Sequence, residues 1–259
     1  MTVPIAIAGA AGRMGQRLRA LAEQDDQLAV AGLWESPSHP AVGRDGIVGA
    51  IEPAIANARV YIDFTRPEPT LAHLAAAAER GVAAVIGTTG FEQPVPELFA
   101  DAARRIPIVW APNMSIGVTL LRKLVYDAVR ALGPGYDTEI IEMHHRWKED
   151  APSGTAKALL RSVQQARGDT GHVVTGREGM TGARRDDEIG VFALRGGDVV
   201  GDHTVILAGI GERIELGHRA GSRDTFAAGA LRAARWVVDQ PPGLYDMFDV
   251  LGWSDARID

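Results

Sequence analysis

Short apolar runs alternate with longer amphipathic runs through the first 113 residues of this 259-residue chain. The apolar runs have the length and composition of buried strands: Pro4–Ala8, Leu28–Trp34, Tyr61–Phe64, Ala83–Ile86 and Ile106–Trp110. The runs between them carry apolar residues at helical spacing: Met14–Gln24, Thr70–Arg80 and Val95–Arg105. Strands that alternate with helices in this way form a parallel, doubly wound sheet with helices on both faces. We therefore predict an α/β domain of that architecture.

The pattern changes after residue 113. Ser115 is a suitable N-terminal cap for a long helix that ends near Gly133. We expect one face of this helix to be apolar, with these residues on it: Ile116, Leu120, Leu124 and Ala128.

A second sheet is predicted in the remainder of the chain. A strand at Thr138–His144 and a helix at Ser153–Gln165 come first. Three runs separated by glycine-containing turns then predict an antiparallel meander: Ile189–Arg195, Val199–Leu207 and Arg213–His218. The last helix, Thr225–Val238, is apolar and rich in small residues, so we expect it to pack on the first sheet.

These patterns divide the chain into two domains. We expect residues 1–113 and 223–259 to form a dinucleotide-binding domain with a Rossmann-type sheet, and residues 114–222 to form an inserted α+β mixed-sheet domain. The inserted domain has few helices left to cover the outer face of its sheet, so we expect it to mediate self-association.

Composition narrows the functional class. A chain that is 46% hydrophobic and 23% charged has material for a folded core, and a net charge of −6 argues against a nucleic-acid partner. No apolar run reaches the length of a membrane span, and no basic residue precedes the apolar N-terminal stretch as in a signal peptide. With no cysteine, the chain has no disulfide or thiolate chemistry. We expect a soluble, cytoplasmic protein.

A glycine loop directly follows the first predicted strand and opens the first predicted helix. Its glycines, Gly9, Gly12 and Gly15, permit a tight turn, close approach of a pyrophosphate and close packing of helix on strand. Glu35 lies 20 residues beyond Gly15, at the end of the second strand, where a carboxylate accepts hydrogen bonds from ribose hydroxyls. The loop predicts a dinucleotide site; the competing interpretation is a purely structural glycine turn.

Two further loops follow the fourth and fifth apolar runs, at residues 87–90 and 111–113. In an open parallel sheet the ligand lies outside the carboxyl ends of the strands. We therefore expect both loops to face the nicotinamide half of a bound dinucleotide. For Thr88 and Thr89, a simple hydroxyl-rich turn is the alternative.

The densest chemistry lies between His144 and Thr155. A histidine exchanges protons near neutral pH, and Lys148 adds a positive charge. Ser153, Gly154 and Thr155 open a helix whose N-terminal N–H groups suit a carboxylate. The two adjacent histidines at a strand end point to opposite faces, so we predict no metal site. The alternative is a basic, solvated strand end beside a capped helix.

The segment HHRWKEDAPSGTA resembles the H-H-R-x-K-x-D-A-P-S-G-T-A signature of the dihydrodipicolinate reductases, now called 4-hydroxy-tetrahydrodipicolinate reductases. The resemblance extends through GAAGRMG, DFTRPE, VIGTTGF, APNMSIGV and SRDTFAAGALRAARW. It implies an NAD(P)H-dependent homotetramer that reduces 4-hydroxy-tetrahydrodipicolinate to tetrahydrodipicolinate in the diaminopimelate–lysine pathway, with the substrate bound by the inserted domain at residues 114–222.

The resemblance also implies residue roles. His144 would donate and accept the proton, with Lys148 as a second donor, and the substrate carboxylates would contact His145, Gly154 and Thr155, beside Ser153. The cofactor would be lined by Gly9, Ala10, Ala11, Gly12, Arg13, Met14, Glu35, Gly87, Thr88, Thr89, Ala111, Pro112, Asn113 and Met114.

The sequence departs from many family members directly after Glu35, where Ser36 replaces a basic residue that pairs with the 2′-phosphate of NADPH. Glu35 accepts from a free 2′-hydroxyl and repels a phosphate, and the nearest following cation is Arg44. We therefore predict that NADH is preferred and that NADPH is also used.

Two other functions are compatible with these residues. One is a different Rossmann-type dehydrogenase acting on another imino or amino acid. The other is a nonenzymatic NAD(P)-binding sensor, which would bind cofactor without turnover.

Overall fold

The computed structural model describes residues 2–253 and contains two compact units. The first unit is formed by residues 2–116 together with residues 223–253. The second unit is formed by Gly117–Ser222.

The first unit is built on a seven-stranded sheet in which every neighbouring pair is parallel. Its strands, in spatial order, are β12 (Gly243–Tyr245), β6 (Pro107–Trp110), β5 (Ala83–Ile86), β4 (Val60–Asp63), β1 (Val3–Ala8), β2 (Leu28–Trp34) and β3 (Ile47–Val48). All four residues of both β4 and β5 are buried, because helices cover both faces of the sheet.

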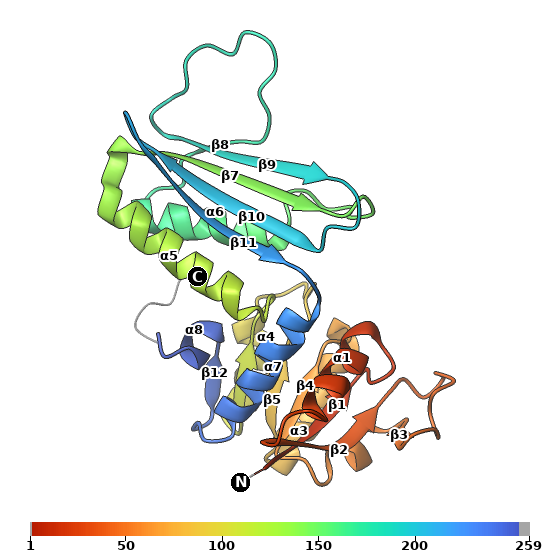
Figure 1. Cartoon of the computed structure of the whole chain (residues 1–259). Coiled ribbons are helices and arrows are strands. Elements are labelled where there is room, and N and C mark those ends of the chain that lie inside the picture. Colours follow the sequence, from red (N-terminus) through yellow and green to blue (C-terminus); the bar gives the residue numbers. More distant parts are fainter. Residues whose placement is uncertain (1, 254–259) are drawn as a thin grey trace. The chain divides into compact units, whose positions relative to one another are not determined.

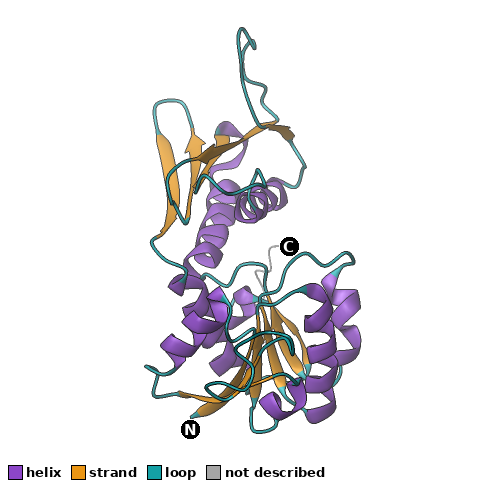
Figure 2. Cartoon of the chain, turned by 90° about the vertical axis from the view of Figure 1, so that its right-hand side faces the viewer, coloured by secondary structure: helices purple, strands orange, loops and turns teal. Residues whose placement is uncertain are grey.

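The helices of this unit form two layers, and Figure 2 shows the sheet between them. One apolar core joins the sheet to α1 (Arg13–Ala22), α7 (Asp224–Val237) and α8 (Met247–Val250). A second core joins the other face to α2 (Ile51–Ile55), α3 (Pro67–Arg80) and α4 (Val95–Ala103). The predicted doubly wound parallel sheet and the packing of the last long helix on it are confirmed.

The second unit contains a mixed five-stranded sheet (Figure 1). Its spatial order is β11 (Arg213–Ala220), β10 (Gly201–Ala208), β7 (Asp137–His144), β9 (Glu188–Arg195) and β8 (His172–Val174). Two helices, α5 (Ile116–Leu132) and α6 (Gly154–Arg167), share an apolar core with one face of this sheet, and a 3₁₀ turn at Gly133–Gly135 follows α5.

The predicted antiparallel meander is wrong in one respect. β10 pairs antiparallel with β11 as expected, but β9 does not pair with β10. Instead β7 lies between them, antiparallel to β10 and parallel to β9. The helix α6 carries the chain across from β7 toward the β8–β9 side, and a helical crossover of this kind produces a parallel pair.

The predicted long helix is present as α5, but the four residues expected to share an apolar face are not all packed against a core. Leu120 and Leu124 are 41% and 45% exposed. The buried stripe is displaced around the helix and contains Val118, Leu121, Val125 and Val129. The apolar residues of this helix fill more than one stripe, so spacing alone did not identify the one that packs.

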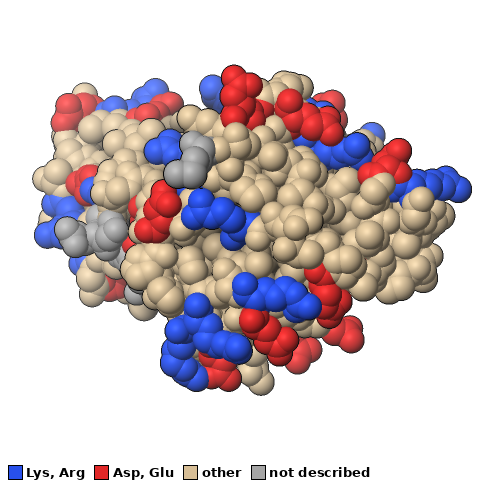
Figure 3. Space-filling model, turned by 90° about the horizontal axis from the view of Figure 1, so that it is seen from below, with Lys and Arg blue, Asp and Glu red and all other residues tan. Residues whose placement is uncertain are grey.

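The opposite face of the second sheet remains partly exposed. Ile141, Met143 and Ile206 are only partly buried on it, and Leu194 is 50% exposed. Over residues 2–253, no helix is long and apolar enough to cross a membrane. Acidic and basic side chains are interspersed over the face of the molecule seen in Figure 3.

Candidate functional site

The glycine loop of the first unit joins β1 to α1 as predicted. Gly9 has a φ of +69°, in the left-handed region. The N–H of Gly12 donates a hydrogen bond to the carbonyl oxygen of Gly9 at 2.9 Å. A Cβ atom on Gly15 would lie 2.1 Å from the same oxygen. No side chain caps α1, so its first N–H groups are left for a ligand.

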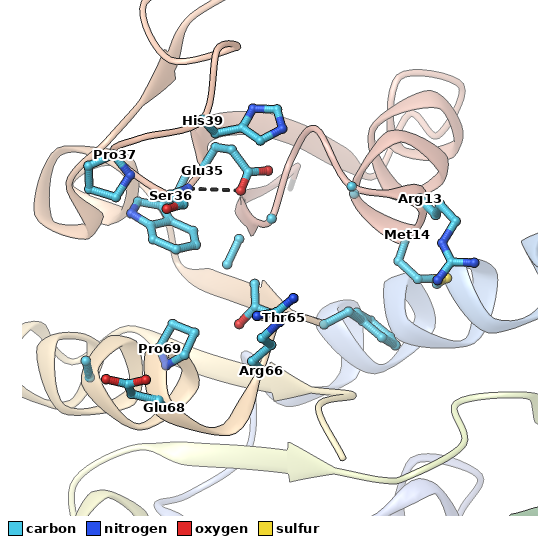
Figure 4. A pocket seen from close by; sticks show the side chains of 17 residues that line it. Arg13, Met14, Glu35, Ser36, Pro37, His39, Thr65, Arg66, Glu68 and Pro69 are labelled. Carbon is cyan, nitrogen blue, oxygen red and sulfur yellow. Dashed lines mark hydrogen bonds between the residues drawn. The ribbon is translucent and has the colours of Figure 1, made fainter. Parts of the chain in front are cut away.

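A groove of about 890 Å³ opens at the carboxyl ends of β1, β2 and β4 (Figure 4). Its lining residues come from the glycine loop, the segment after β2 and the segment after β4: Ala8, Gly9, Gly12, Arg13, Met14, Gly15, Trp34, Glu35, Ser36, Pro37, His39, Phe64, Thr65, Arg66, Glu68, Pro69 and Ala72. This is the edge at which parallel sheets of this type bind their ligands.

The carboxylate of Glu35 is tied to backbone on both sides. Its Oε2 accepts from the N–H of Ala11 at 3.1 Å, and its Oε1 accepts from the N–H of Ser36 at 2.9 Å. The carboxylate therefore lies beside the glycine loop on the wall of the groove, where it presents acceptors and a negative charge.

Two residues of the groove, a histidine and an arginine, were not among the predicted site residues. His39 lies on the same side as Glu35, and Arg66 lies across the groove beside Thr65 (Figure 4). Arg44 is exposed and does not line the groove. Arg66 lies in the segment that follows β4, and loops at the carboxyl ends of parallel strands face the ligand.

The two loops expected near the nicotinamide do not line this groove. Thr88 is 2% exposed, and its hydroxyl lies 2.8 Å from that of Thr70. Ala111 and Met114 are buried in the core, while Thr89 and Pro112 are exposed. The side chain of Asn113 accepts from the N–H of Ser115 at 2.9 Å.

In the second unit, His144 ends β7 and lies on the same face as Glu142. Its Nδ1 lies 2.5 Å from Glu142 Oε2, and the two residues are 8% and 0% exposed. Sequence reasoning missed Glu142, although two residues apart on a strand always share a face. Glu142 also accepts from the N–H of Ser153 at 3.0 Å, which joins the strand end to the start of α6.

Arg195, at the end of β9, completes this cluster. Its Nη1 and Nη2 donate to the two carboxylate oxygens of Glu142, each at 3.0 Å. Its Nη2 also donates to the carbonyl oxygen of Asp150 at 2.7 Å. Arg195 and His144 are register partners in the β7–β9 pair, a proximity that the sequence did not reveal.

Ser153 and His203 form a second buried contact. The hydroxyl of Ser153 caps α6 by accepting from the N–H of Ala156 at 3.1 Å, and it lies 3.2 Å from His203 Nε2. The rings of His144 and His203 are edge to face, with centroids 5.1 Å apart.

Lys148 lies on the loop after β7, where its ammonium group donates to Asp150 at 2.7 Å. This pairing lowers the pKa of Asp150. His145 is half-buried and its ring centroid lies 5.9 Å from that of Trp147. Gly154 is exposed and Thr155 half-buried, both in the first turn of α6.

Burial and neighbouring charges set the protonation of the cluster. Burial lowers the pKa of His144, and the charges of Lys148 and Arg195 lower it further, against the opposing effect of Glu142. Burial tends to raise the pKa of Glu142, but hydrogen bonds from Arg195, His144 and Ser153 leave it below its usual value. Burial lowers the pKa of His203 to about 4. At neutral pH the cluster therefore holds an ionised carboxylate beside neutral imidazoles.

The described residues contain no group of three or more histidines or carboxylates suited to hold a metal ion. The cluster thus offers proton exchange at His144, a cation at Lys148, and the N-terminus of α6 as an anion site.

Comparison with known proteins gives matches over nearly the whole chain. Residues 3–114 match the family described as "Dihydrodipicolinate reductase, N-terminus", and residues 117–251 match "Dihydrodipicolinate reductase, C-terminus". The chain is 50% identical over 265 residues to the 4-hydroxy-tetrahydrodipicolinate reductase of Thiobacillus denitrificans, covering 97% of this chain and 99% of that protein. It is 51% identical over 261 residues to the protein of the same name from Aromatoleum aromaticum, covering 96% and 95%.

The fold also has a close structural counterpart. The solved structure of a dipicolinate-bound dihydrodipicolinate reductase from Paenisporosarcina sp. TG-14 has a TM-score of 0.80 and 26% identity, and the match covers 96% of this chain and 99% of that one. The chain therefore belongs to the dihydrodipicolinate reductase family of NAD(P)H-dependent oxidoreductases.

Proposed function

We propose that this protein reduces 4-hydroxy-tetrahydrodipicolinate to tetrahydrodipicolinate with NAD(P)H, in the diaminopimelate–lysine pathway. The observation that carries the proposal is the buried His144–Glu142 pair beside Lys148 and the N-terminus of α6. It occurs in a chain about half identical, over nearly its full length, to proteins with that name. Because NAD(P)H is a cytoplasmic reductant, we also propose a cytoplasmic location.

We propose that the second unit binds the substrate, which is a dicarboxylate. The first-turn N–H groups at Gly154 and Thr155, with the positive end of the α6 dipole, suit one carboxylate. His145 and Lys148 supply further donors for the substrate. The dipicolinate bound in the related solved structure is a small aromatic dicarboxylate, which supports this ligand class.

His144 would exchange the proton at the substrate ring. Its lowered pKa leaves the imidazole neutral in the free protein, and two substrate carboxylates nearby would raise that pKa and favour the imidazolium. The ring would then donate from Nε2, because Glu142 occupies Nδ1. Lys148 would serve as a second proton donor.

We propose that the first unit holds the dinucleotide, which supplies the hydride when bound. The uncapped start of α1 and the glycine loop suit the pyrophosphate, and Glu35 suits the ribose hydroxyls. The other cofactor contacts proposed from the sequence, at residues 87–89 and 111–114, follow β5 and β6 at the same sheet edge. NADH would be preferred because Glu35 repels a 2′-phosphate, and the 2′-phosphate of NADPH would have to pair with the guanidinium group of Arg66.

We further propose a homotetramer. The partly exposed apolar face of the second sheet, which includes Ile141, Met143 and Leu194, is suited to burial against other copies of the chain.

A coupled assay tests the function. Pyruvate and aspartate semialdehyde are condensed by an aldolase, and oxidation of NADH or NADPH is followed after the purified protein is added. We expect turnover by the wild type and strong loss in His144→Gln. Cofactor binding without turnover would support a sensor, and turnover only with another imino acid would support a different dehydrogenase.

A further inference from the structure

We infer that Glu142 is a positioning residue for the proton exchange at His144: its ionised carboxylate holds the imidazole as the Nδ1–H tautomer and stabilises the imidazolium when Nε2 takes up a proton. The inference rests on the proposed function, in which His144 is the acid–base group. It names Glu142 as the residue that determines which ring nitrogen of His144 is protonated.

The geometry of β7 shows which ring nitrogen of His144 carries the hydrogen. Glu142 and His144 are two residues apart on one strand, so both side chains point to the face that α6 covers. A carboxylate has no proton to give, so at 2.5 Å the ring nitrogen must be the donor. With Nδ1 engaged in this way, Nε2 is the nitrogen that exchanges a proton with a ligand.

The carboxylate remains ionised although it is fully buried. Besides His144, it accepts two hydrogen bonds from Arg195 and one from the N–H of Ser153, each at 3.0 Å. A buried charge is stable when it is paired and its oxygens are satisfied in this way. Arg195 thereby keeps Glu142 from taking up the proton that His144 must handle.

Gly201 faces the other side of the ring. It lies on β10, where a Cβ atom would stand 3.0 Å from His144 Nε2. A side chain here would crowd the nitrogen that exchanges the proton. Glu142 therefore engages Nδ1 of His144. Because residue 201 is a glycine, no side chain at that position obstructs Nε2.

The charged and titratable groups around His144 come from several elements. Glu142 lies on its own strand, Arg195 on β9, His203 on β10, and Lys148 with Asp150 on the following loop. Of these, Glu142 raises the pKa of His144, while Lys148 and Arg195 lower it. Removal of the Glu142 charge therefore leaves the cations unopposed, and the imidazolium becomes less stable.

A purely structural role is the competing explanation. Glu142 also anchors Arg195 and the start of α6, and Arg195 in turn holds the carbonyl oxygens of Lys148 and Asp150. If Glu142 only supported these segments, its replacement would lower stability or substrate affinity. The tautomer and the titration of His144 would then be unchanged.

The test combines nitrogen NMR with kinetics on the full-length protein. In ¹⁵N-histidine-labelled protein, long-range proton–nitrogen spectra report the tautomer and titration of each ring, and His144→Gln identifies the signals of His144. We expect the Nδ1–H tautomer in the wild type. In Glu142→Gln we expect the titration midpoint of His144 to fall by about one pH unit, and kcat to fall about 10- to 100-fold, with the KM for NADH within about twofold.

The matched control is Glu139→Gln. Glu139 is a carboxylate on the same strand, paired with Arg177 and Arg184, but its odd position places it on the opposite face. We expect this variant to leave the tautomer, the titration and kcat unchanged. If Glu142→Gln does not fold, Glu142→Asp, which keeps the charge, is expected to retain the Nδ1–H tautomer and more activity than any neutral replacement.

A wild-type ring protonated on Nε2, or a His144 titration unaffected by Glu142→Gln, would overturn the inference. The NMR measurements need no substrate. If the tautomer is as expected but the protein does not reduce 4-hydroxy-tetrahydrodipicolinate, the proposed function has failed while the role of Glu142 stands.

Discussion

Glu35 accepts a hydrogen bond from the backbone N–H of Ala11 at 3.1 Å, so a carboxylate at the end of β2 is fixed against the glycine loop. Its negative charge is held on the wall of the groove in which the adenosine end of a dinucleotide would bind. A fixed carboxylate at this position would favour a ribose hydroxyl over a phosphate.

The first prediction concerns cofactor choice. We expect a lower KM for NADH than for NADPH, by about tenfold, because the 2′-phosphate meets Glu35 and finds no cation at residue 36. Ser36→Arg is expected to narrow or reverse the gap, and Arg66→Ala to weaken NADPH more than NADH. Arg44→Ala is the control, since Arg44 lies outside the groove. If the wild type has the lower KM for NADPH, a cation of the groove attracts the 2′-phosphate more strongly than Glu35 repels it.

The second prediction concerns the proton donors. His144→Gln and Lys148→Ala should each lower kcat by roughly 10²- to 10⁴-fold and leave NADH affinity almost unchanged. Lys123→Ala is a matched control, because the side chains of Lys123 and Lys148 are both 21% exposed and each is paired with an aspartate. Turnover near the wild-type value in both site variants would exclude the assignment.

The third prediction is a pH dependence of stability caused by His203. Burial lowers its pKa from 6.5 to about 4 in the folded protein, so the unfolded chain binds more protons between these values. Stability is then full above pH 6.5 and decreases as the pH falls toward 4, by about 2 kcal/mol between pH 7 and pH 5. Urea unfolding at the two pH values measures this difference.

His203→Gln should reduce this dependence, since no titratable ring remains at that position. The exposed His39 provides the control, and His39→Gln should show the wild-type dependence. An equal loss of stability on acidification in wild type and His203→Gln would show that another group is responsible.

The fourth prediction tests the packing of α1 on the glycine loop. Gly15→Ala places a Cβ atom 2.1 Å from the Gly9 carbonyl oxygen, a contact that requires the backbone to move. We expect a loss of about 3 kcal/mol in the free energy of unfolding, together with weaker NADH binding. Gly135→Ala has open space around the new methyl group and should be nearly neutral. Calorimetry and fluorescence titration measure the two effects.

The fifth prediction concerns assembly. Light scattering of the wild type should give about four times the chain mass of 27.6 kDa. Leu194→Asp introduces a charge on the partly exposed sheet face and should reduce that mass. Ile210→Asp, at a fully exposed loop position, should not. A wild-type mass equal to one chain at all concentrations would contradict the tetramer.

Local patterns were sufficient to predict five of the seven strands of the first sheet. Runs such as Ala83–Ile86 are apolar throughout because helices cover both sheet faces. A short, continuously apolar run in the sequence therefore indicates a buried strand directly. β3 and β12 have only two and three residues, too few to show any period. The order of the second sheet depends on which strands pair across long stretches of chain, and no local signal specifies that β7 lies between β9 and β10.

In the candidate site, too, the residues within one segment could be predicted, and those brought together by strand pairing could not. His144 and Lys148 stand in one segment with a recognisable chemistry, so they were identified as candidates. The two-residue period of a strand places Glu142 on the same face as His144, so the sequence could have indicated it. An acidic residue on a strand is more often solvent-exposed, however, and it was therefore not selected. Arg195 lies 53 residues from Glu142 along the chain, and only the parallel register of β7 and β9 brings the two together.

The central place of β7 has a kinetic consequence. It is hydrogen-bonded to β9 on one side and β10 on the other, so its N–H groups are shielded by neighbours at both edges. Strands in that position exchange their amide hydrogens slowly, because the unit must open extensively before they separate. Edge segments such as β8 or β11 can fray while Glu142 and His144 stay in register. Glu142 and His144, the pair proposed to handle the proton, are thereby attached to the strand that we expect to open last in its unit. Their alignment should survive fluctuations that loosen the rest of the sheet.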